Sequence, residues 1–247
     1  MRNNFFIKEP IVNIFEEPRN NSNITSQLIY GEKFNILDQK NNYFKIKSSY
    51  DKYSGFIKKV YSHKKFNPTH KIRILKSRIY LGNEKKKSNK FLPFASKIEI
   101  LDINKNFVLY ERGKWLKSTD VYPIAKKNTN FTKIFKSFLN CKYKWGGKTF
   151  EGIDCSALLQ IFYKFNNSFF PRDTVDQIKL KKGVLSKKNF KKGDIIFWKG
   201  HVAICINSNY LIHAYGPKKK VIMMPIRKTI RLIKKTAKLD VKKIIKV

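Results

Sequence analysis

The chain has 247 residues, of which 42% are hydrophobic and 14% aromatic, so it can form packed cores and is not of the intrinsically disordered class. No apolar run approaches the roughly 20 residues of a membrane-spanning helix, and three cysteines do not make a closed disulfide framework. The formal charge of +37 is typical of proteins that bind polyanions, but also of a lysine-rich composition spread along the whole chain, and both interpretations stay open.

The chain begins MRNNFFIKEPIVNIF, where Lys8, Glu9 and Pro10 interrupt the apolar residues. A secretory signal needs an uninterrupted apolar stretch and a small-residue cleavage site. We therefore expect a cytoplasmic protein. We also expect reduced thiols, since the cysteines form no disulfide framework, and we expect no cofactor and no metal.

Residues 11–62 break into short apolar runs separated by turn residues, which predicts half-buried strands of a small barrel. The segments IVNIFEEP, LIYGEKFNIL and KYSGFIKKV resemble a bacterial SH3-like domain. Lys52 and Phe56 stand where that pattern more often has Gly and Trp.

Residues 70–122 repeat this pattern less clearly, because SKIEILDINKNFVLYERGKWL parallels GEKFNILDQKNNYFKIKSSYDKYSGFI. This parallel predicts a divergent second barrel. The apolar period is lost over residues 123–130, so we expect two SH3-like barrels at residues 1–65 and 66–125 and a third domain at residues 126–247.

From Phe131 the apolar residues recur at helical spacing and predict a short helix that ends near Asn140. The stretch YKWGGKTFEGIDCS follows, and its glycines predict a compact turn. An apolar helix then begins at Cys155, with Asp154 as its N-cap. The unpaired N–H groups and the dipole of a helix start favour a thiolate, which predicts a thiol pKa below the usual value of about 8.5.

The segment FPRDTVDQIK predicts a turn into another helix, and Ile195 to Phe197 predict an apolar strand. His201 to Ile206 and Tyr210 to Tyr215 predict a hairpin with a three-residue loop. That loop pairs Ile206 with Tyr210, which places His201 and His213 on one face of the sheet. For residues 221–247 we expect one or two strands and a basic connection.

A thiol at a helix start, followed by histidines on two neighbouring strands, has the order of nucleophile, base and orienting group. Taken alone, Cys155 would more often be an inert buried cysteine, and a zinc site of Cys155, His201 and His213 is a further alternative. Cys141 and Cys205 are interpreted as structural.

The motifs YKWGGKTFEGIDCS, FPRDTVDQ, KKGDIIFW, GHVAI and YLIHA resemble, in order and spacing, the NlpC/P60 family of cell-wall cysteine peptidases. The resemblance implies an α+β chain with a papain-like catalytic domain after the barrels. It also implies that Cys155 is the nucleophile, His201 the general base and acid, and His213 the residue that orients it. Tyr143 matches a tyrosine that assists the oxyanion. Ala157 and Ala203 replace residues that are more often glycine.

Members of this family with SH3-like domains cleave the γ-D-glutamyl bond to meso-diaminopimelate or lysine in murein peptides that have a free N-terminal L-Ala. By this resemblance Asp154, Ser156 and Tyr53 hold the amine. Asp154 is also expected to cap its helix. Arg172 is either an ion-pair partner in the fold or a ligand for a substrate carboxylate.

The resemblance therefore implies a cysteine endopeptidase of cell-wall turnover or recycling, with a murein peptide or peptidoglycan fragment as partner. We also expect a monomer and no specific nucleic-acid partner. Two alternatives stay open: a wall- or nucleic-acid-binding protein with a vestigial cysteine domain, and an amidase or acyl transferase with the same Cys-His chemistry. Diaminopimelate and lysine are not distinguished, nor are free peptide and intact peptidoglycan.

Overall fold

The computed structural model describes residues 4–60, 62–63 and 65–246. Its contacts divide the chain into two compact units, described separately below. Unit 1 comprises Met1–Asn128 together with Lys164–Ser168, and unit 2 comprises Thr129–Tyr163 together with Phe169–Val247. The division after Asn128 lies within residues 123–130, where the apolar period of the sequence is lost.

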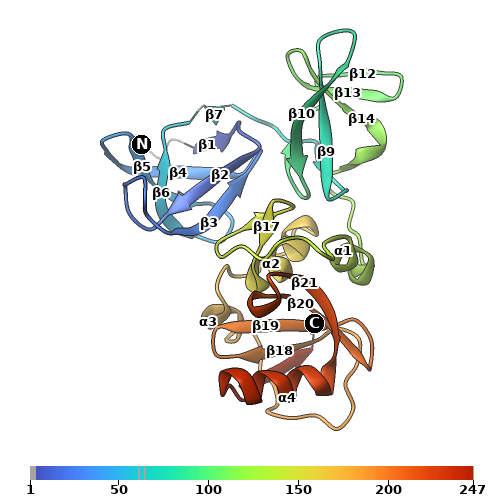
Figure 1. Cartoon of the computed structure of the whole chain (residues 1–247). Coiled ribbons are helices and arrows are strands. Elements are labelled where there is room, and N and C mark those ends of the chain that lie inside the picture. The colour runs from blue at the N-terminus through green and yellow to red at the C-terminus, as the bar shows by residue number, and fades with distance from the viewer. Residues whose placement is uncertain (1–3, 61, 64, 247) are drawn as a thin grey trace. The chain divides into compact units, whose positions relative to one another are not determined.

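The first part of unit 1 is an antiparallel sheet (Figure 1). Alternating residues of its strands enclose one core. Its strands are β1 (Asn4–Ile7), β2 (Ile11–Phe15), β3 (Ile24–Ile29), β4 (Lys33–Lys40), β5 (Tyr43–Ser48), β6 (Ser54–Lys58) and β7 (Ser62–His63). Along β2, Val12 and Ile14 are buried and their neighbours are half-buried. The predicted runs of residues 11–62 therefore form strands, and period-two burial builds this core.

The rest of unit 1 forms two further sheets around a second core, as a second small barrel requires. One sheet contains β9 (Lys76–Leu81), β10 (Lys86–Pro93), β12 (Asp102–Asn104), β13 (Phe107–Glu111) and β14 (Lys114–Lys117). The other contains β8 (His70–Ile72), β11 (Lys97–Ile98) and β15 (Val121–Pro123). The exact domain boundaries at residues 65 and 125 stay a prediction.

Unit 2 combines helices with a larger antiparallel sheet and a small two-stranded one (Figure 1). The helices are α1 (Phe131–Ser137), α2 (Cys155–Phe165), whose last residues belong to unit 1, α3 (Thr174–Gln177) and α4 (Ile226–Ala237). The strands are β16 (Lys148–Thr149), β17 (Gly152–Ile153), β18 (Asp194–Trp198), β19 (His201–Cys205), β20 (Tyr210–Tyr215), β21 (Lys220–Pro225) and β22 (Lys243–Lys246). The larger sheet has the order β21-β20-β19-β18-β22. The chain is thus an α+β protein.

The predicted hairpin of β19 and β20 is confirmed. Ile204 pairs with Ile212 and Cys205 with Leu211, and the backbone N–H of Ile206 donates to the carbonyl of Tyr210. This is the register that the three-residue loop predicts. It carries His201 and His213 to one face of the sheet, because side chains alternate along each strand.

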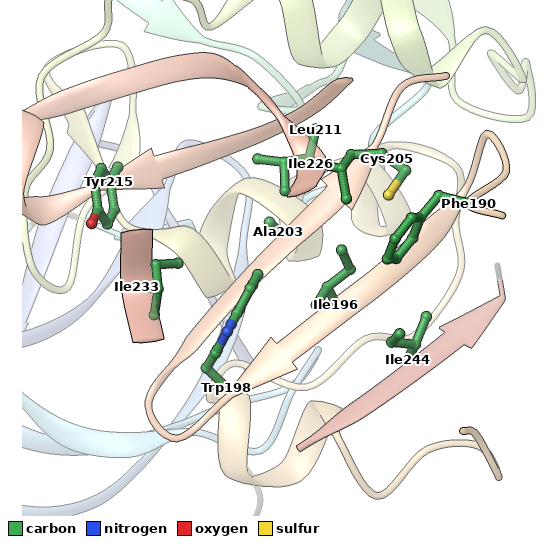
Figure 2. Packing of buried hydrophobic residues seen from close by; sticks show 10 residues of the cluster. All are labelled: Phe190, Ile196, Trp198, Ala203, Cys205, Leu211, Tyr215, Ile226, Ile233 and Ile244. Carbon is green, nitrogen blue, oxygen red and sulfur yellow. The ribbon is translucent and has the colours of Figure 1, made fainter. Parts of the chain in front are cut away.

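The expected strands after residue 221 are β21 and β22, and the basic connection between them is helix α4, which was not predicted as a helix. Its buried residues Ile226 and Ile233, with the half-buried Ile230, follow helical spacing, a signal that the many lysines and arginines between them obscured. Figure 2 shows Ile226 and Ile233 in the core cluster with Trp198 and Ala203 of the sheet. The helix therefore buries an apolar stripe and exposes a basic one.

None of the described helices combines the length and the apolar character that a membrane crossing requires.

Candidate active site

The first turn of α2 is held by the residue in front of it. The Oδ1 atom of Asp154 accepts a hydrogen bond of 2.8 Å from the backbone N–H of Ala157, and the Asp154 carbonyl accepts one of 3.1 Å from Leu158. An oxygen that accepts from the third residue of a helix is the usual N-cap arrangement. The predicted cap is therefore confirmed, and it places Cys155 in the first turn.

The turn before Asp154 is compact, and at Gly147 the surrounding backbone leaves no room for a side chain. A Cβ atom on Gly147 would lie 2.3 Å from the carbonyl oxygen of Gly152. Gly146 adopts a φ of 73°, in the left-handed region that glycine tolerates. This geometry lets the Gly146 N–H donate to Oδ2 of Asp154 at 3.0 Å. The turn thus supplies a second backbone donor to the carboxylate.

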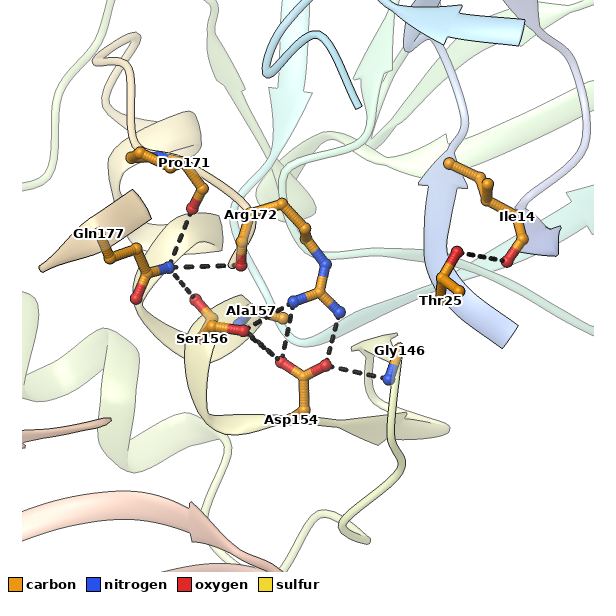
Figure 3. A network of polar contacts seen from close by, with 9 residues as sticks. All are labelled: Ile14, Thr25, Gly146, Asp154, Ser156, Ala157, Pro171, Arg172 and Gln177. Atoms are coloured by element: carbon orange, nitrogen blue, oxygen red, sulfur yellow. Dashed lines mark hydrogen bonds and ion pairs between the residues drawn. The ribbon is translucent and has the colours of Figure 1, made fainter. Parts of the chain in front are cut away.

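The Asp154 carboxylate is also paired with a buried arginine (Figure 3). Arg172 donates from Nη1 to Oδ1 at 3.1 Å and from Nη2 to Oδ2 at 2.5 Å, and the Ser156 hydroxyl donates to Oδ1 at 3.0 Å. Among the described residues, the two oxygens accept five hydrogen bonds in all. Bidentate pairing with dense hydrogen bonding is what makes a buried ion pair tolerable.

Gln177 extends this network and was not singled out from the sequence. Its side chain is fully buried, and its Nε2 donates to the carbonyls of Ser156 at 3.0 Å and Pro171 at 2.9 Å (Figure 3). It therefore ties the start of α2 to the loop that carries Arg172. The FPRDTVDQ motif contains this glutamine, so the signal was present.

Cys155 is 5% exposed, and its thiol does not have the lowered pKa that its helix position predicts. Burial and the Asp154 carboxylate raise the pKa of the Cys155 thiol to about 12. The backbone N–H groups of Val202 and Ser156 act in the opposite, predicted direction but are outweighed. The prediction of a lowered pKa was wrong because it considered the N–H groups of the helix start and not the removal of water from the thiol, which disfavours the charged thiolate. The Cys155 thiol therefore carries its proton at neutral pH.

The two histidines meet directly. Nε2 of His201 lies 2.9 Å from Nδ1 of His213, and the His213 ring stacks on Tyr215 with centroids 4.6 Å apart and an interplanar angle of 9°. His213 is completely buried and His201 is half-buried at the start of β19. Because Nε2 of His201 faces His213, Nδ1 is the ring nitrogen left for a thiol.

Burial keeps both imidazoles neutral. It lowers the pKa of His201 to about 4, and burial together with the neighbouring His201 lowers the pKa of His213 well below its usual value. At neutral pH the site therefore holds an uncharged thiol and two uncharged imidazoles. In this state His201 can accept a proton, which an imidazolium cannot do.

Tyr143 lies within electrostatic reach of Cys155, Asp154 and Arg172. Burial is the main cause that raises the pKa of its hydroxyl to about 12, and the nearby Cys155 thiol, where it ionises, and the Asp154 carboxylate act in the same direction. The hydroxyl consequently keeps its proton and can donate a hydrogen bond. That is the property an oxyanion-stabilising group needs.

The remaining predicted site residues are used in other ways or lie elsewhere. Ser156 accepts from Nη1 of Arg172 at 2.7 Å, so any substrate amine would share Asp154 and Ser156 with this guanidinium. Arg172 has the ion-pair role that the sequence allowed. Tyr53 belongs to unit 1, where it packs against the first core. The assignments of all four as substrate ligands stay predictions.

Comparisons with known proteins agree with this architecture. The NlpC/P60 family matches residues 140–237, and the bacterial SH3 domain matches residues 12–63. The gamma-D-glutamyl-L-lysine dipeptidyl-peptidase of Bacillus subtilis is 24% identical over 233 residues, which cover 84% of this chain and 77% of that protein. Dipeptidyl-peptidase 6 of Lysinibacillus sphaericus is 22% identical over 242 residues, covering 83% and 84%.

Among solved structures, an NlpC/P60 family protein from Bacillus cereus superposes with a TM-score of 0.77 over 90% of this chain and 94% of its own, at 19% identity. This likeness shows a shared fold over nearly the whole length. The two matched segments show that the chain contains an NlpC/P60 domain, of a family of cysteine peptidases, and a bacterial SH3 domain ahead of it.

Proposed function

We propose that this protein is a cysteine endopeptidase that hydrolyses the bond between γ-D-glutamate and the following diamino acid, diaminopimelate or lysine, in murein peptides with a free N-terminal L-Ala. The observation that carries the proposal is the 2.9 Å contact between His201 and His213. Val202 follows His201 directly in β19, and its backbone N–H faces the Cys155 sulfur. The two relatives that align over most of the chain bear the names of dipeptidyl-peptidases.

In the first step the Cys155 sulfur attacks the γ-glutamyl carbonyl carbon while Nδ1 of His201 takes the thiol proton. The carbonyl oxygen becomes an oxyanion, for which the Tyr143 hydroxyl and N–H groups at the start of α2 are the available donors. The C–N bond then breaks, and His201 returns the proton to the departing amine of the diamino acid.

The second step hydrolyses the thioester that remains. His201 takes a proton from a water molecule, the water oxygen bonds to the carbonyl carbon, and the C–S bond breaks. The proton returns to the Cys155 sulfur, so the enzyme is regenerated and the product carries a new γ-carboxyl group. Because thiol and base start neutral, the ion pair forms during the attack.

A cleavage assay tests the proposal. The wild-type protein is incubated with L-Ala-γ-D-Glu-L-Lys and with L-Ala-γ-D-Glu-diaminopimelate, and the products are identified by mass spectrometry. We expect release of the dipeptide L-Ala-D-Glu, and loss of all turnover in Cys155→Ala, because the nucleophile is gone. No cleavage of either peptide by the wild type, or undiminished cleavage by Cys155→Ala, would overturn the proposal.

The same peptides with an acetylated N-terminus test the requirement for a free amine. We expect cleavage to fall sharply, since a site that binds an ammonium ion leaves its polar groups unpaired when the ammonium is replaced by an amide. Equal cleavage of both forms would favour a broader amidase. Comparing soluble peptides with intact sacculi would show which of them is the substrate.

A further inference from the structure

The second ring nitrogen of His213 faces sulfur. Its Nε2 lies 3.4 Å from Sδ of Met224, a half-buried residue of β21, while its Nδ1 faces His201. We propose that Met224 is a positioning residue that selects the tautomer of His213 and thereby keeps His201 competent as a base. This inference rests on the proposed function, because it concerns the same thiol chemistry.

The register of β20 and β21 brings the two side chains together. His213 pairs with Ile222 and Leu211 pairs with Met224, so His213 and Met224 are diagonal neighbours on one face of the sheet. The stack on Tyr215 fixes the plane of the His213 ring. Because the strand pairing and the ring plane are both fixed, Nε2 of His213 is held against Sδ of Met224.

The contact between the histidines allows two proton arrangements. A neutral imidazole has one N–H donor and one acceptor nitrogen. In the first arrangement Nε2–H of His201 donates to Nδ1 of His213, which leaves Nδ1 of His201 with a free lone pair. In the second, Nδ1–H of His213 donates to Nε2 of His201, and the His201 proton then sits on Nδ1. Only the first arrangement lets Nδ1 of His201 accept the thiol proton.

Met224 distinguishes these arrangements because a thioether sulfur has no proton to donate. In the first arrangement His213 carries its proton on Nε2 and donates it to the sulfur. In the second, an unprotonated Nε2 would face the sulfur lone pairs. His213 is completely buried, so water does not readily substitute for the missing donor. The sulfur therefore favours the first arrangement.

The same tautomer serves the later stage of the reaction. Once Nδ1 of His201 has taken the proton, the imidazolium still donates from Nε2 to the lone pair of His213 Nδ1. A hydrogen bond from a charged donor is stronger than a neutral one. Met224 thus acts through His213 on both the resting base and its charged form, without touching the reacting atoms.

Nuclear magnetic resonance of the intact protein tests the inference. The chain has only four histidines, so ¹⁵N-histidine labelling gives a spectrum in which the tautomer of His213 can be assigned. We expect the wild type to carry the His213 proton on Nε2. In Met224→Leu, which keeps the bulk and removes the acceptor, we expect a shift toward Nδ1–H and a loss of about twofold to tenfold in kcat with little change in KM.

Met223→Leu is the matched control, because Met223 is the adjacent methionine, pairs with Ile212 and is 38% exposed. It should leave both the His213 tautomer and kcat unchanged. If Met224→Leu fails to fold, norleucine incorporation in the Met223→Leu background removes the sulfur with minimal change of shape, since the chain has only three methionines.

A His213 proton on Nδ1 in the wild type, or an unchanged tautomer in both sulfur-free forms, would overturn the inference. An altered tautomer with full kcat would overturn the role of Met224 in the reaction. The tautomer is measured without substrate, so a wild type that cleaves no murein peptide but shows Nε2–H would count against the proposed function and not against the selection of the tautomer by Met224.

Discussion

At the start of α2 the chain buries a full ion pair, whereas on β19 and β20 it buries two uncharged imidazoles. Asp154 and Arg172 are 7% and 3% exposed in their side chains and are covered by hydrogen bonds, so their charges are satisfied inside the fold. His201 and His213 have one hydrogen bond between them and pKa values lowered by burial. The ion pair holds the backbone at the start of α2, whereas the two imidazoles that we propose for proton transfer are neutral.

This difference teaches which part of the site tolerates change. The α2 start depends on an ion pair whose halves are costly when separated. The histidine side depends on register and on the position of single protons, which cost less to alter but act directly on the reaction. We therefore expect variants of the first region to lower stability and variants of the second to lower turnover.

The largest effect is expected at the histidines. His201→Ala should lower kcat/KM by about 10² to 10⁴, because it removes the proton acceptor. His213→Ala should lower it less, since the orienting residue acts through His201. Steady-state kinetics on the murein tripeptide measure both, with His70→Ala as a control for loss of an imidazole that contacts Thr69. A greater loss in His213→Ala than in His201→Ala would reverse the roles assigned to them.

The next effect is on stability. Arg172→Leu should lower the free energy of unfolding by about 3–5 kcal/mol, because it leaves the buried Asp154 carboxylate without its cation. Urea unfolding followed by circular dichroism measures this loss. The exposed pair of Lys179 and Asp176, 2.9 Å apart with side chains 73% and 56% exposed, offers the control, and Lys179→Leu should cost at most about 1 kcal/mol. Equal costs would mean that the α2 start does not depend on its ion pair.

The smallest effect is a shift of the pH profile. Because His201 must be neutral to accept a proton and burial lowers its pKa to about 4, activity should fall only as the pH drops toward that value, not near the 6.5 of an ordinary histidine. Alkylation of Cys155 by iodoacetamide should increase steadily above pH 9, since the pKa of the thiol is raised to about 12.

Peptide mapping separates the label on Cys155 from that on the half-exposed Cys141. A half-maximal kcat/KM near pH 6.5, or alkylation of Cys155 that is already maximal and constant from pH 5 upward, would contradict the neutral resting pair. The second result would indicate a preformed thiolate and imidazolium instead.

Local patterns of the sequence determined much of this protein. Alternation and a three-residue loop were enough to place His201 and His213 on one face, because side-chain direction in a hairpin follows from register alone. The N-cap at Asp154 and the helix start at Cys155 followed from the residue types around them. The helix α4 also has a local signal, in the spacing of Ile226, Ile230 and Ile233, but it was outweighed by the charges between them.

Only the tertiary structure decided the charge state of the site. Whether Cys155 is a thiolate depends on the water that packing removes and on the nearby Asp154 carboxylate, and neither effect can be calculated from a position in a helix. The pairing of Arg172 with Asp154 and the contact of Met224 with His213 likewise join residues through space. Hairpin register and helix capping depend on neighbouring residues and can therefore be predicted from the sequence. Burial and the positions of protons depend on which distant segments pack around each atom.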